Sequence, residues 1–295
     1  MVRLLAVFIQ LPDVNSSLRL ARLLGRGLYR IYGGGRQRAI EHLQLSFPDK
    51  DLAWCERTAC RSFEHIVMLV FDLIYTPRLI RTSSWHHYVD LSEIVHLRHV
   101  LRLMIEGRGI IMVTGHYGNF IVLGCALATF GLETHNIARP IDNPHIDRYV
   151  YGRLFRNQTI IYKKGATDTM LERLEGGGVL GFIADQNAGK KGLFVDFFGR
   201  KASTYKSIGL LALEYNLPVV IGYCRRIEDR FRFKLGVSRT LYPAEWQSQA
   251  DPLRWITAEY TKAIEQFVRE EPEQYWWVHR RWKTRPAEEL RDKGI

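Results

Sequence analysis

The sequence predicts an α/β fold with a largely parallel central sheet, and two observations carry that prediction. From about residue 98 onwards, short runs rich in β-branched residues alternate with segments of helical length. Strands and helices that alternate at this spacing form crossover units, which build parallel sheets. The first ninety or so residues instead carry apolar residues at helical spacing, so we expect a mainly helical N-terminal portion.

The N-terminal portion contains two clear helical patterns. Residues 16–31 place apolar residues and arginines in separate sectors of a helical wheel, and residues 52–75 carry a second apolar pattern that ends at a Thr-Pro-Arg sequence. Between the two patterns, YGGGRQR at 32–38 is expected to be flexible, because glycines favour loops.

The helix expected at 16–31 has two interpretations. An apolar face beside an arginine face is typical of a helix that lies in a membrane interface. The same pattern also suits a helix that packs on a core and turns a basic face to solvent. Residues 1–47 hold seven arginines against two acidic residues, which favours the membrane interpretation.

Five β-rich runs are expected to form the sheet, followed by an alternating strand that we expect to be antiparallel. The five runs are 109–115, 134–139, 159–164, 178–185 and 218–225, and the added strand is 231–237. Helical segments are expected near 119–130, 144–157, 167–176, 206–216 and 253–270. We found no linker, so residues 1–95 are predicted to be a helical, membrane-associating portion and 96–295 an α/β core, in one continuous domain.

Composition narrows the class of protein. Lys and Arg number 42 against 31 acidic residues, a formal charge of +11 that predicts an anionic partner: nucleic acid, a membrane surface or an acidic protein. A hydrophobic content of 46% is typical of a globular chain. The four cysteines form no C-x-x-C pair and are interpreted as reduced thiols, which argues against a zinc site. No window of about 18 uncharged apolar residues exists, so no transmembrane helix is predicted.

Polar side chains follow four of the expected strands. They are His116, Asp185 with the adjacent Gln186, Arg139 and Lys164. Because ligands gather beyond the carboxyl ends of strands in open α/β sheets, we expect these side chains to form one site. Taken alone, each has a plain structural alternative, such as a histidine that only packs or an Asp-Gln pair that only caps a turn.

Motifs across nearly the whole chain carry a family resemblance. They are RAIEHLQLSFPD (38–49), TGHYGNF (114–120), ARPIDNP (138–144), GFIADQN (181–187), VDFFGRKAST (195–204), LALEYNLPVV (211–220) and PEQYWWVHRRWKTRP (272–286). In these motifs and their order, the chain resembles the bacterial lysophospholipid acyltransferase family, of the lipid A late (lauroyl and myristoyl) acyltransferase type.

The resemblance implies a glycerolipid acyltransferase-like fold and a membrane-associated enzyme. The implied reaction moves a fatty acyl group from an acyl carrier protein or coenzyme A thioester to a hydroxyl of a bacterial membrane (glyco)lipid. It implies no metal and no cofactor beyond the acyl thioester as co-substrate. The implied location is peripheral, on the cytoplasmic face of the inner membrane.

The same resemblance makes His116 the general base, able to take the proton of the attacking hydroxyl. Amides at the helix start after Gly118 and Asn119 are expected to stabilise the oxyanion. The family motif places Asp or Glu five positions after the histidine, where it would orient the imidazole, but this chain has Ile121 there.

Three interpretations of Ile121 are open. In the first, Asp185 orients His116 instead. In the second, the chain is a catalytically disabled lipid-binding or scaffold protein of the same fold. In the third, the isoleucine is an introduced substitution.

Several further residues are candidates for binding substrate. They are Asn119, Arg139, Arg153, Lys164, Gln186 and Thr204. Guanidinium groups pair with phosphate and carboxylate, which suits an anionic lipid, although Arg153 is equally typical of a solvated helix face and Thr204 of a helix cap.

The tail at 272–286 mixes tryptophans with cations, a combination that suits a membrane interface, a nucleic acid or a buried cation–π layer. The resemblance favours the first and third, so the expected partners are an anionic membrane lipid and acyl carrier protein or acyl-CoA, with no nucleic acid.

Overall fold

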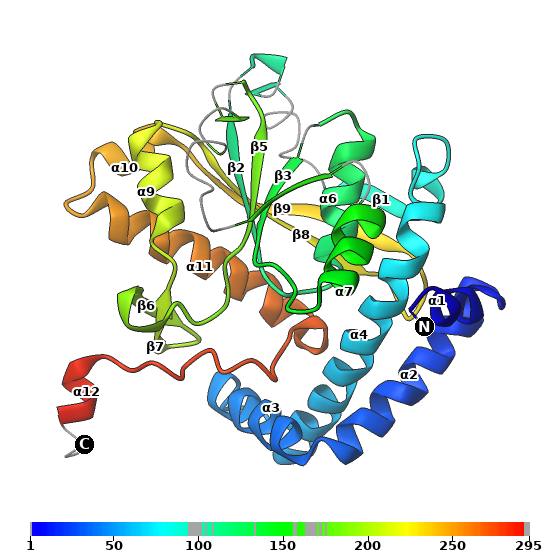
Figure 1. The fold of residues 1–295 in the computed structure, drawn as a ribbon. Coiled ribbons are helices and arrows are strands. Elements are labelled where there is room, and N and C mark those ends of the chain that lie inside the picture. Colours follow the sequence, from blue (N-terminus) through cyan, green and yellow to red (C-terminus); the bar gives the residue numbers. More distant parts are fainter. Residues whose placement is uncertain are drawn as a thin grey trace.

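The computed structural model describes residues 2–93, 102–103, 105–107, 109–132, 134–155, 158–162, 170, 173–174 and 176–291. The chain begins with helices α1 (Val2–Gln10), α2 (Val14–Ile31), α3 (Gly33–Ser46) and α4 (Leu52–Leu79). They line the lower and right-hand margin of the molecule in Figure 1. The expected helical N-terminal portion is therefore confirmed.

Two details of this portion differ from the sequence-based expectation. The segment expected to be flexible at 32–38 is helical, because α3 begins at Gly33. At Gly35 a Cβ would lie 2.3 Å from the ring of Tyr32, so a glycine lets the chain close onto that ring. The helix expected at 52–75 continues through Pro77 to Leu79.

A seven-stranded sheet forms the centre of the molecule, in the order β1-β9-β8-β2-β5-β3-β4. Its strands are β1 (Val89–Glu93), β2 (Ile110–Thr114), β3 (Thr134–Ala138), β4 (Gln158–Tyr162), β5 (Val179–Ile183), β8 (Val219–Arg226) and β9 (Phe233–Leu241). All neighbours are parallel except β8 and β9, which confirms the predicted mixed, mostly parallel sheet and its antiparallel addition.

Two parts of the β-structure were not predicted from the sequence. One is the edge strand β1, and the other is an antiparallel hairpin of β6 (Leu193–Phe197) and β7 (Arg200–Thr204), which forms a separate two-stranded sheet.

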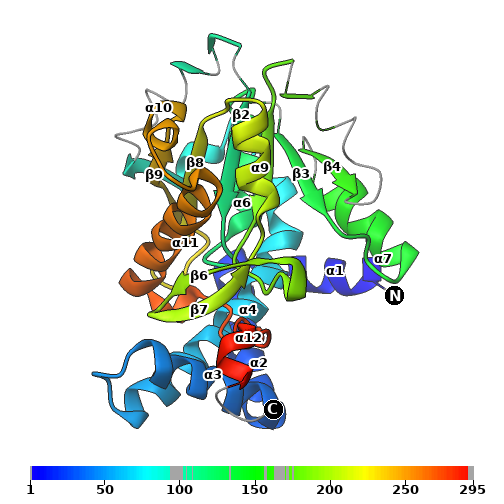
Figure 2. The same cartoon turned by 90° about the vertical axis from the view of Figure 1, so that its left-hand side faces the viewer.

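Helices cover both faces of the central sheet (Figures 1 and 2). One face carries α4, α6 (Phe120–Thr129) and α7 (Pro144–Tyr149), followed by a π-helical turn, η2 (Val150–Leu154). The other carries α9 (Ser207–Glu214), α10 (Pro243–Gln247) and α11 (Pro252–Glu270). The chain closes with the short helix α12 (Ala287–Arg291). The helix expected at 167–176 lies largely outside the described residues.

Strand β2 shows why both faces are covered. All of its residues are buried, and successive side chains point to opposite faces of a strand. Ile111 and Val113 join the apolar cluster under α11, whereas Ile110 and Met112 join the cluster under α4 and α6. Because β2 and its neighbours β5 and β8 are parallel, their carboxyl ends meet at one edge, which we call the carboxyl edge.

Candidate active site

The turn from β2 into α6 carries His116 to the carboxyl edge. Gly118 has a φ of +53°, and a Cβ there would lie 2.2 Å from the carbonyl oxygen of Cys224, so the turn requires glycine. The amide of Gly118 donates to the carbonyl of Gln274 at 3.0 Å, and the amide of Asn119 donates to Cys224 at 2.7 Å. The turn is thus fixed on two sides.

His116 is held by the two residues that follow strand β5. Its Nδ1 lies 2.7 Å from Oδ1 of Asp185, and its Nε2 lies 3.2 Å from Nε2 of Gln186. An ionised carboxylate only accepts hydrogen bonds, so Nδ1–H donates to Asp185 and Nε2 presents a lone pair, towards which the Gln186 amide donates. The structure therefore brings together three residues that the sequence places at two separate strand ends.

Asp185 is a buried carboxylate with a lowered pKa. Burial alone would raise its pKa, but the charge and hydrogen bonds of His116, together with the charge of Arg281, lower it below the usual value. Asp185 is therefore ionised at neutral pH and stabilises a positive charge on the imidazole. Burial and the charge of Asp185 raise the pKa of the Tyr275 phenol well above its ordinary value, so that group stays neutral.

Ile121 does not line the site. It is 5% exposed and packs in the apolar cluster under α4 and α6. An isoleucine suits that environment, since a carboxylate there would be desolvated.

The C-terminal segment 275–284 packs against His116 and Asn187 and completes the site. The amide of Trp276 donates to the carbonyl of His116 at 3.1 Å, and the ring of Trp276 lies 4.8 Å from the imidazole. Nε2 of His279 accepts a hydrogen bond from the amide of Asn187 at 3.0 Å, and burial lowers the pKa of His279 to about 4. The tail is thus part of the structure around the histidine.

Arg281 lies in the tail at 272–286, for which the sequence suggested a membrane interface, a nucleic acid or a buried cation–π layer. It is 2% exposed and donates to the carbonyl of Ser203 and to Oγ1 of Thr204, at 2.5 and 2.7 Å. Its guanidinium lies 5.3 Å from the centre of the Phe197 ring, which matches the buried cation–π interpretation of the tail. The hydroxyl of Thr204 is buried and engaged, so it holds Arg281 and does not face the cavity.

The remaining candidate residues lie in different surroundings. Asn119 is buried, caps α6 through Val122 and donates to Asp72 at 2.8 Å. Arg139 is 84% exposed at its side chain, where it pairs with Asp142. Arg153 lies in η2, and nothing is described of its side chain. Lys164 lies outside the described residues.

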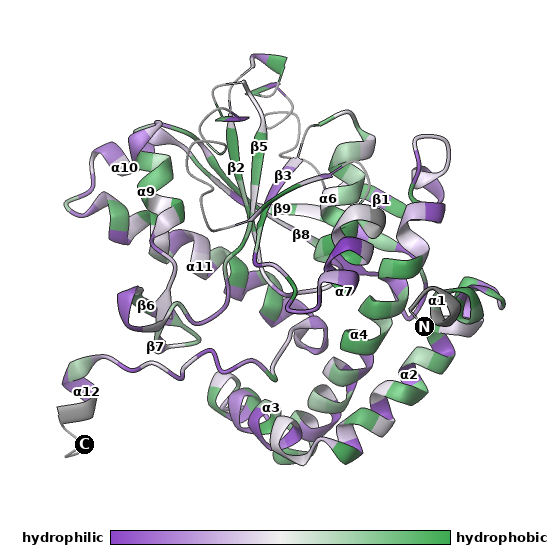
Figure 3. Cartoon of the chain, in the orientation of Figure 1, coloured by the Kyte–Doolittle hydropathy of each residue, from purple (hydrophilic) through white to green (hydrophobic). Residues whose placement is uncertain are grey.

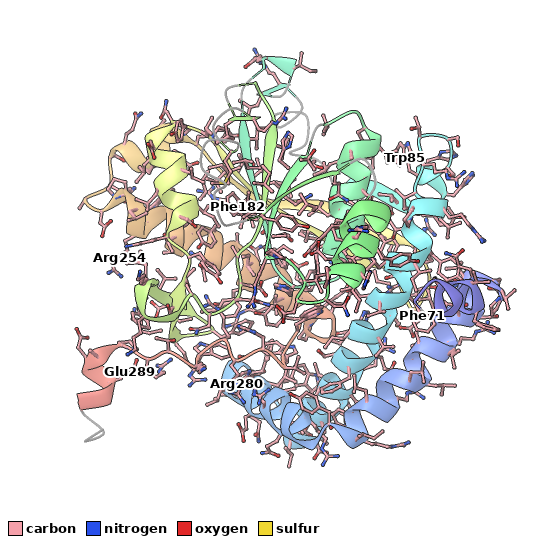
Figure 4. The ribbon with its side chains drawn as sticks, viewed as in Figure 1. Phe71, Trp85, Phe182, Arg254, Arg280 and Glu289 are labelled. Carbon is pink, nitrogen blue, oxygen red and sulfur yellow. The ribbon has the colours of Figure 1, made fainter. Side chains whose placement is uncertain are left out.

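An apolar cavity of about 210 Å³ opens beside His116, between α6 and strands β2, β5, β3 and β4. Its walls include Met112, Leu123, Leu127, Phe155, Ile160 and Ile183. Phe182 of β5, which also lines it, is labelled near the centre of Figure 4. Sequence patterns did not reveal the cavity, because apolar residues that line a cavity have the same periodicity as those that fill a core.

Within the described parts of the chain, no group of three or more His, Cys, Asp or Glu side chains could hold a metal ion. The fold and the site define a class: an α/β protein in which a histidine–carboxylate pair lies beside an apolar cavity at the carboxyl edge of the sheet. Such a pair can exchange a proton with a hydroxyl, and such a cavity suits an aliphatic chain.

Comparison with known proteins identifies the family. The family described as bacterial lipid A biosynthesis acyltransferase matches residues 1–284. The chain therefore belongs to that family, and it is an acyltransferase.

Similar curated proteins cover most of the chain. A lipid A biosynthesis lauroyltransferase of Escherichia coli (strain K12) is 28% identical over 85% of this chain and 80% of its own length. A lipid A biosynthesis acyltransferase of Haemophilus influenzae is 25% identical over 87% of this chain and 79% of its own length. A lipid A biosynthesis palmitoleoyltransferase of Escherichia coli (strain K12) is 26% identical over 85% of this chain and 79% of its own length.

Proposed function

We propose that the protein is an O-acyltransferase that moves a fatty acyl group from an acyl carrier protein or coenzyme A thioester to a hydroxyl of a bacterial membrane glycolipid of the lipid A type. The observation that carries the proposal is the 2.7 Å contact between His116 and the buried, ionised Asp185, beside an apolar cavity. The family match and the names of the relatives support the acyl group and the lipid acceptor.

The proposed reaction uses His116 as a general base. Its Nε2 takes the proton of the acceptor hydroxyl while the hydroxyl oxygen attacks the thioester carbonyl. The resulting tetrahedral oxyanion collapses, the carbon–sulfur bond breaks, and the imidazolium returns the proton to the leaving thiolate. Asp185 holds the imidazole in the tautomer that leaves Nε2 free to accept, and it stabilises the imidazolium.

Gln186 is a side-chain donor beside the reacting atoms, because its amide already lies 3.2 Å from Nε2 of His116. When the acceptor hydroxyl takes that place at Nε2, the displaced amide N–H becomes a donor for the oxyanion. Among the other candidate residues, exposed Arg139 suits a headgroup phosphate or carboxylate.

The surface of α1 and α2 supports a membrane location. Large apolar side chains are exposed there and in the turn between the two helices, among them Phe8 (67%), Leu11 (72%), Leu23 (60%) and Ile31 (86%). Figure 3 shows green, apolar segments along both helices. With exposed Arg19, Arg26 and Arg30 on α2, this surface suits anionic lipid. In the described part of the chain, no helix has the length and apolarity of a membrane span.

We therefore place the protein as a peripheral component of the cytoplasmic face of the inner membrane, with residues 1–95 as the membrane-associating portion of one continuous domain. We also assign the α/β core to the glycerolipid acyltransferase-like folds, on the strength of the histidine at the carboxyl edge and the helices on both faces of the sheet.

The test combines purified protein, a labelled acyl thioester and detergent-dispersed lipid A precursor that carries free hydroxyls. Transfer of label by the unmodified chain, and its loss in His116→Ala, is the expected result. Carrier protein and coenzyme A thioesters are supplied in separate reactions, which identifies the donor. Lipid binding without transfer from any donor would replace the proposal with a disabled, lipid-binding protein of the same fold.

A further inference from the structure

Two amide side chains lie inside the otherwise apolar cavity. Nδ2 of Asn136 on β3 donates to Oε1 of Gln158 on β4 at 2.7 Å. Nε2 of Gln158 in turn donates to Sγ of Cys125 on α6 at 3.0 Å. Asn136 and Gln158, which we call the amide pair, thus connect the sheet to the helix that forms the opposite wall.

The two walls are shaped to admit the amide pair. A Cβ on Gly181 of β5 would lie 2.3 Å from Oδ1 of Asn136, and one on Gly124 of α6 would lie 2.1 Å from Oε1 of Gln158. Both distances are too short for real contacts. The amide of Asn136 therefore occupies the space above its neighbour Gly181 on the same sheet, and the amide of Gln158 occupies the space that a side chain on α6 would need. The amide pair therefore forms a bar that crosses the cavity from Gly181 to Gly124.

Strand register gives the depth of the bar. Asn136 is aligned with Gly181 of β5, which is aligned with Met112 of β2. His116 follows Met112 by four residues, which is roughly 13 Å at ~3.3 Å per residue. Between the bar and His116 the cavity is lined by Thr114 and Ile183, which are themselves aligned. This outer part is an apolar compartment of limited length.

Polarity strengthens the barrier. Among the hydrogen bonds of the described residues, Oδ1 of Asn136 accepts none. A methyl group pressed against this oxygen would shield it from water without offering it a hydrogen bond, which is unfavourable. A longer chain must also displace Gln158 from Asn136 and Cys125. Each methylene that contacts the outer walls should raise the affinity of the acyl chain for the cavity about fourfold, whereas a methylene that reaches the bar should not raise it.

We propose that the Asn136–Gln158 bar sets the maximum length of the acyl chain that the cavity accepts, so that these two residues determine donor specificity. The inference rests on the proposed acyl transfer. It assigns the outer compartment to an unbranched chain of medium length whose carbonyl lies at His116 and whose methyl end stops at the bar.

The first test is competition among donors. Equal amounts of octanoyl, decanoyl, lauroyl, myristoyl and palmitoyl thioesters are supplied together, and the products are separated by mass spectrometry. Gln158→Ala and Asn136→Ala are each expected to shift the preferred product to a longer chain, with the myristoyl or palmitoyl share rising about tenfold, since ~1.4 kcal/mol is a factor of ten. Thr159→Ala, at an exposed residue on the opposite face of the same strand from Gln158, is the control and keeps the wild-type distribution.

The second test needs no catalysis. Binding of the matching free fatty acids to His116→Ala protein, with and without Gln158→Ala, is measured by isothermal titration calorimetry. Affinity is expected to rise with chain length and then level off when Gln158 is present, and to continue rising when it is absent. The same plateau in both proteins would contradict the proposal that the bar limits the chain length. Because this assay requires no turnover, it separates failure of the bar from failure of the proposed transfer, and thermal unfolding verifies that each variant is folded.

Discussion

The carboxyl edge of the sheet and the helix α2 differ in the size of the side chains that they bury. Around His116 the large side chains are inside: Trp277 and Arg281 are no more than 2% exposed. On α2 the buried positions are Ser17, Leu18, Ala21 and Gly25, whereas the other four leucines are exposed, with Leu23 at 60%. Gly25 lets α2 approach α4 so closely that a Cβ there would lie 2.6 Å from the Cα of Glu64.

This difference indicates that the two regions have different roles. At the edge, polar atoms are fixed by neighbours from distant parts of the chain, so the imidazole is already oriented before any substrate binds. On α2, Leu18 and three small residues provide the packing and leave an apolar stripe for a surface outside the protein.

The largest effect is expected for Asp185→Asn. The amide has the shape of the carboxylate but lacks its charge, so it neither fixes the Nδ1–H tautomer nor stabilises the imidazolium. We expect kcat to fall by ~10²–10⁴-fold, measured by steady-state acyl transfer. Asp196→Asn, at an exposed carboxylate on β6, is the matched control and should retain full activity. Near-normal turnover in Asp185→Asn would show that His116 works without an oriented partner.

The next effect is expected for Ile121→Glu, which restores the family carboxylate in sequence but not in environment. A carboxyl group at this 5% exposed position is desolvated, so the free energy of unfolding should fall by about 2–5 kcal/mol with no gain in activity. Urea denaturation and acyl transfer measure the two quantities. Ile105→Glu, at an 86% exposed isoleucine, is the control. A stable and more active Ile121→Glu protein would mean that the site is built for a carboxylate on α6.

A smaller effect is expected from acidification. Burial lowers the pKa of His279 to about 4, whereas an unfolded histidine titrates near its ordinary value of 6.5. Between these values the unfolded chain binds more protons, so stability rises with pH and is lost as the pH falls from about 6.5 to 4. After allowance for partial exposure, we expect a loss of about 1–2 kcal/mol from this residue.

His279→Gln isolates that contribution, because Gln keeps an acceptor for the Asn187 amide but does not titrate. Denaturation curves at several pH values should show a shallower acid slope for the variant than for the wild type. Equal slopes would remove His279 from the acid response and leave it to other buried histidines, such as His42, whose pKa burial also lowers to about 4.

The smallest effect on stability is expected for Leu23→Ser on the exposed face of α2. The free energy of unfolding should change by no more than about 0.5 kcal/mol, but binding to anionic vesicles should weaken, as measured by cosedimentation. Leu18→Ser, on the buried face of the same helix, should instead destabilise the fold, because Leu18 is 0% exposed. Unchanged vesicle binding in a Leu23→Ser, Ile31→Ser double variant would remove α2 from the membrane contact.

Much of the architecture could be predicted from the sequence, because periodicity reports local structure. The β-rich runs and the helical spacing of the first ninety residues correspond to the observed strands and helices. His116 could be placed at a strand end for the same reason. The glycines at 33–35 were misleading, since α3 and its contact with Tyr32 overrode their preference for loops.

The sequence by itself determined the order of most elements, the residues at the strand ends and the family. Only the tertiary structure decided which of those residues meet: Asp185 approaches His116 from 69 positions away, because β5 lies directly beside β2 in the sheet. It also decided that four of the five leucines of α2 face outwards and that Gln158 crosses a cavity to reach α6. The physical reason is that a linear pattern records which side chains share a face, whereas strand order and helix packing determine what that face touches.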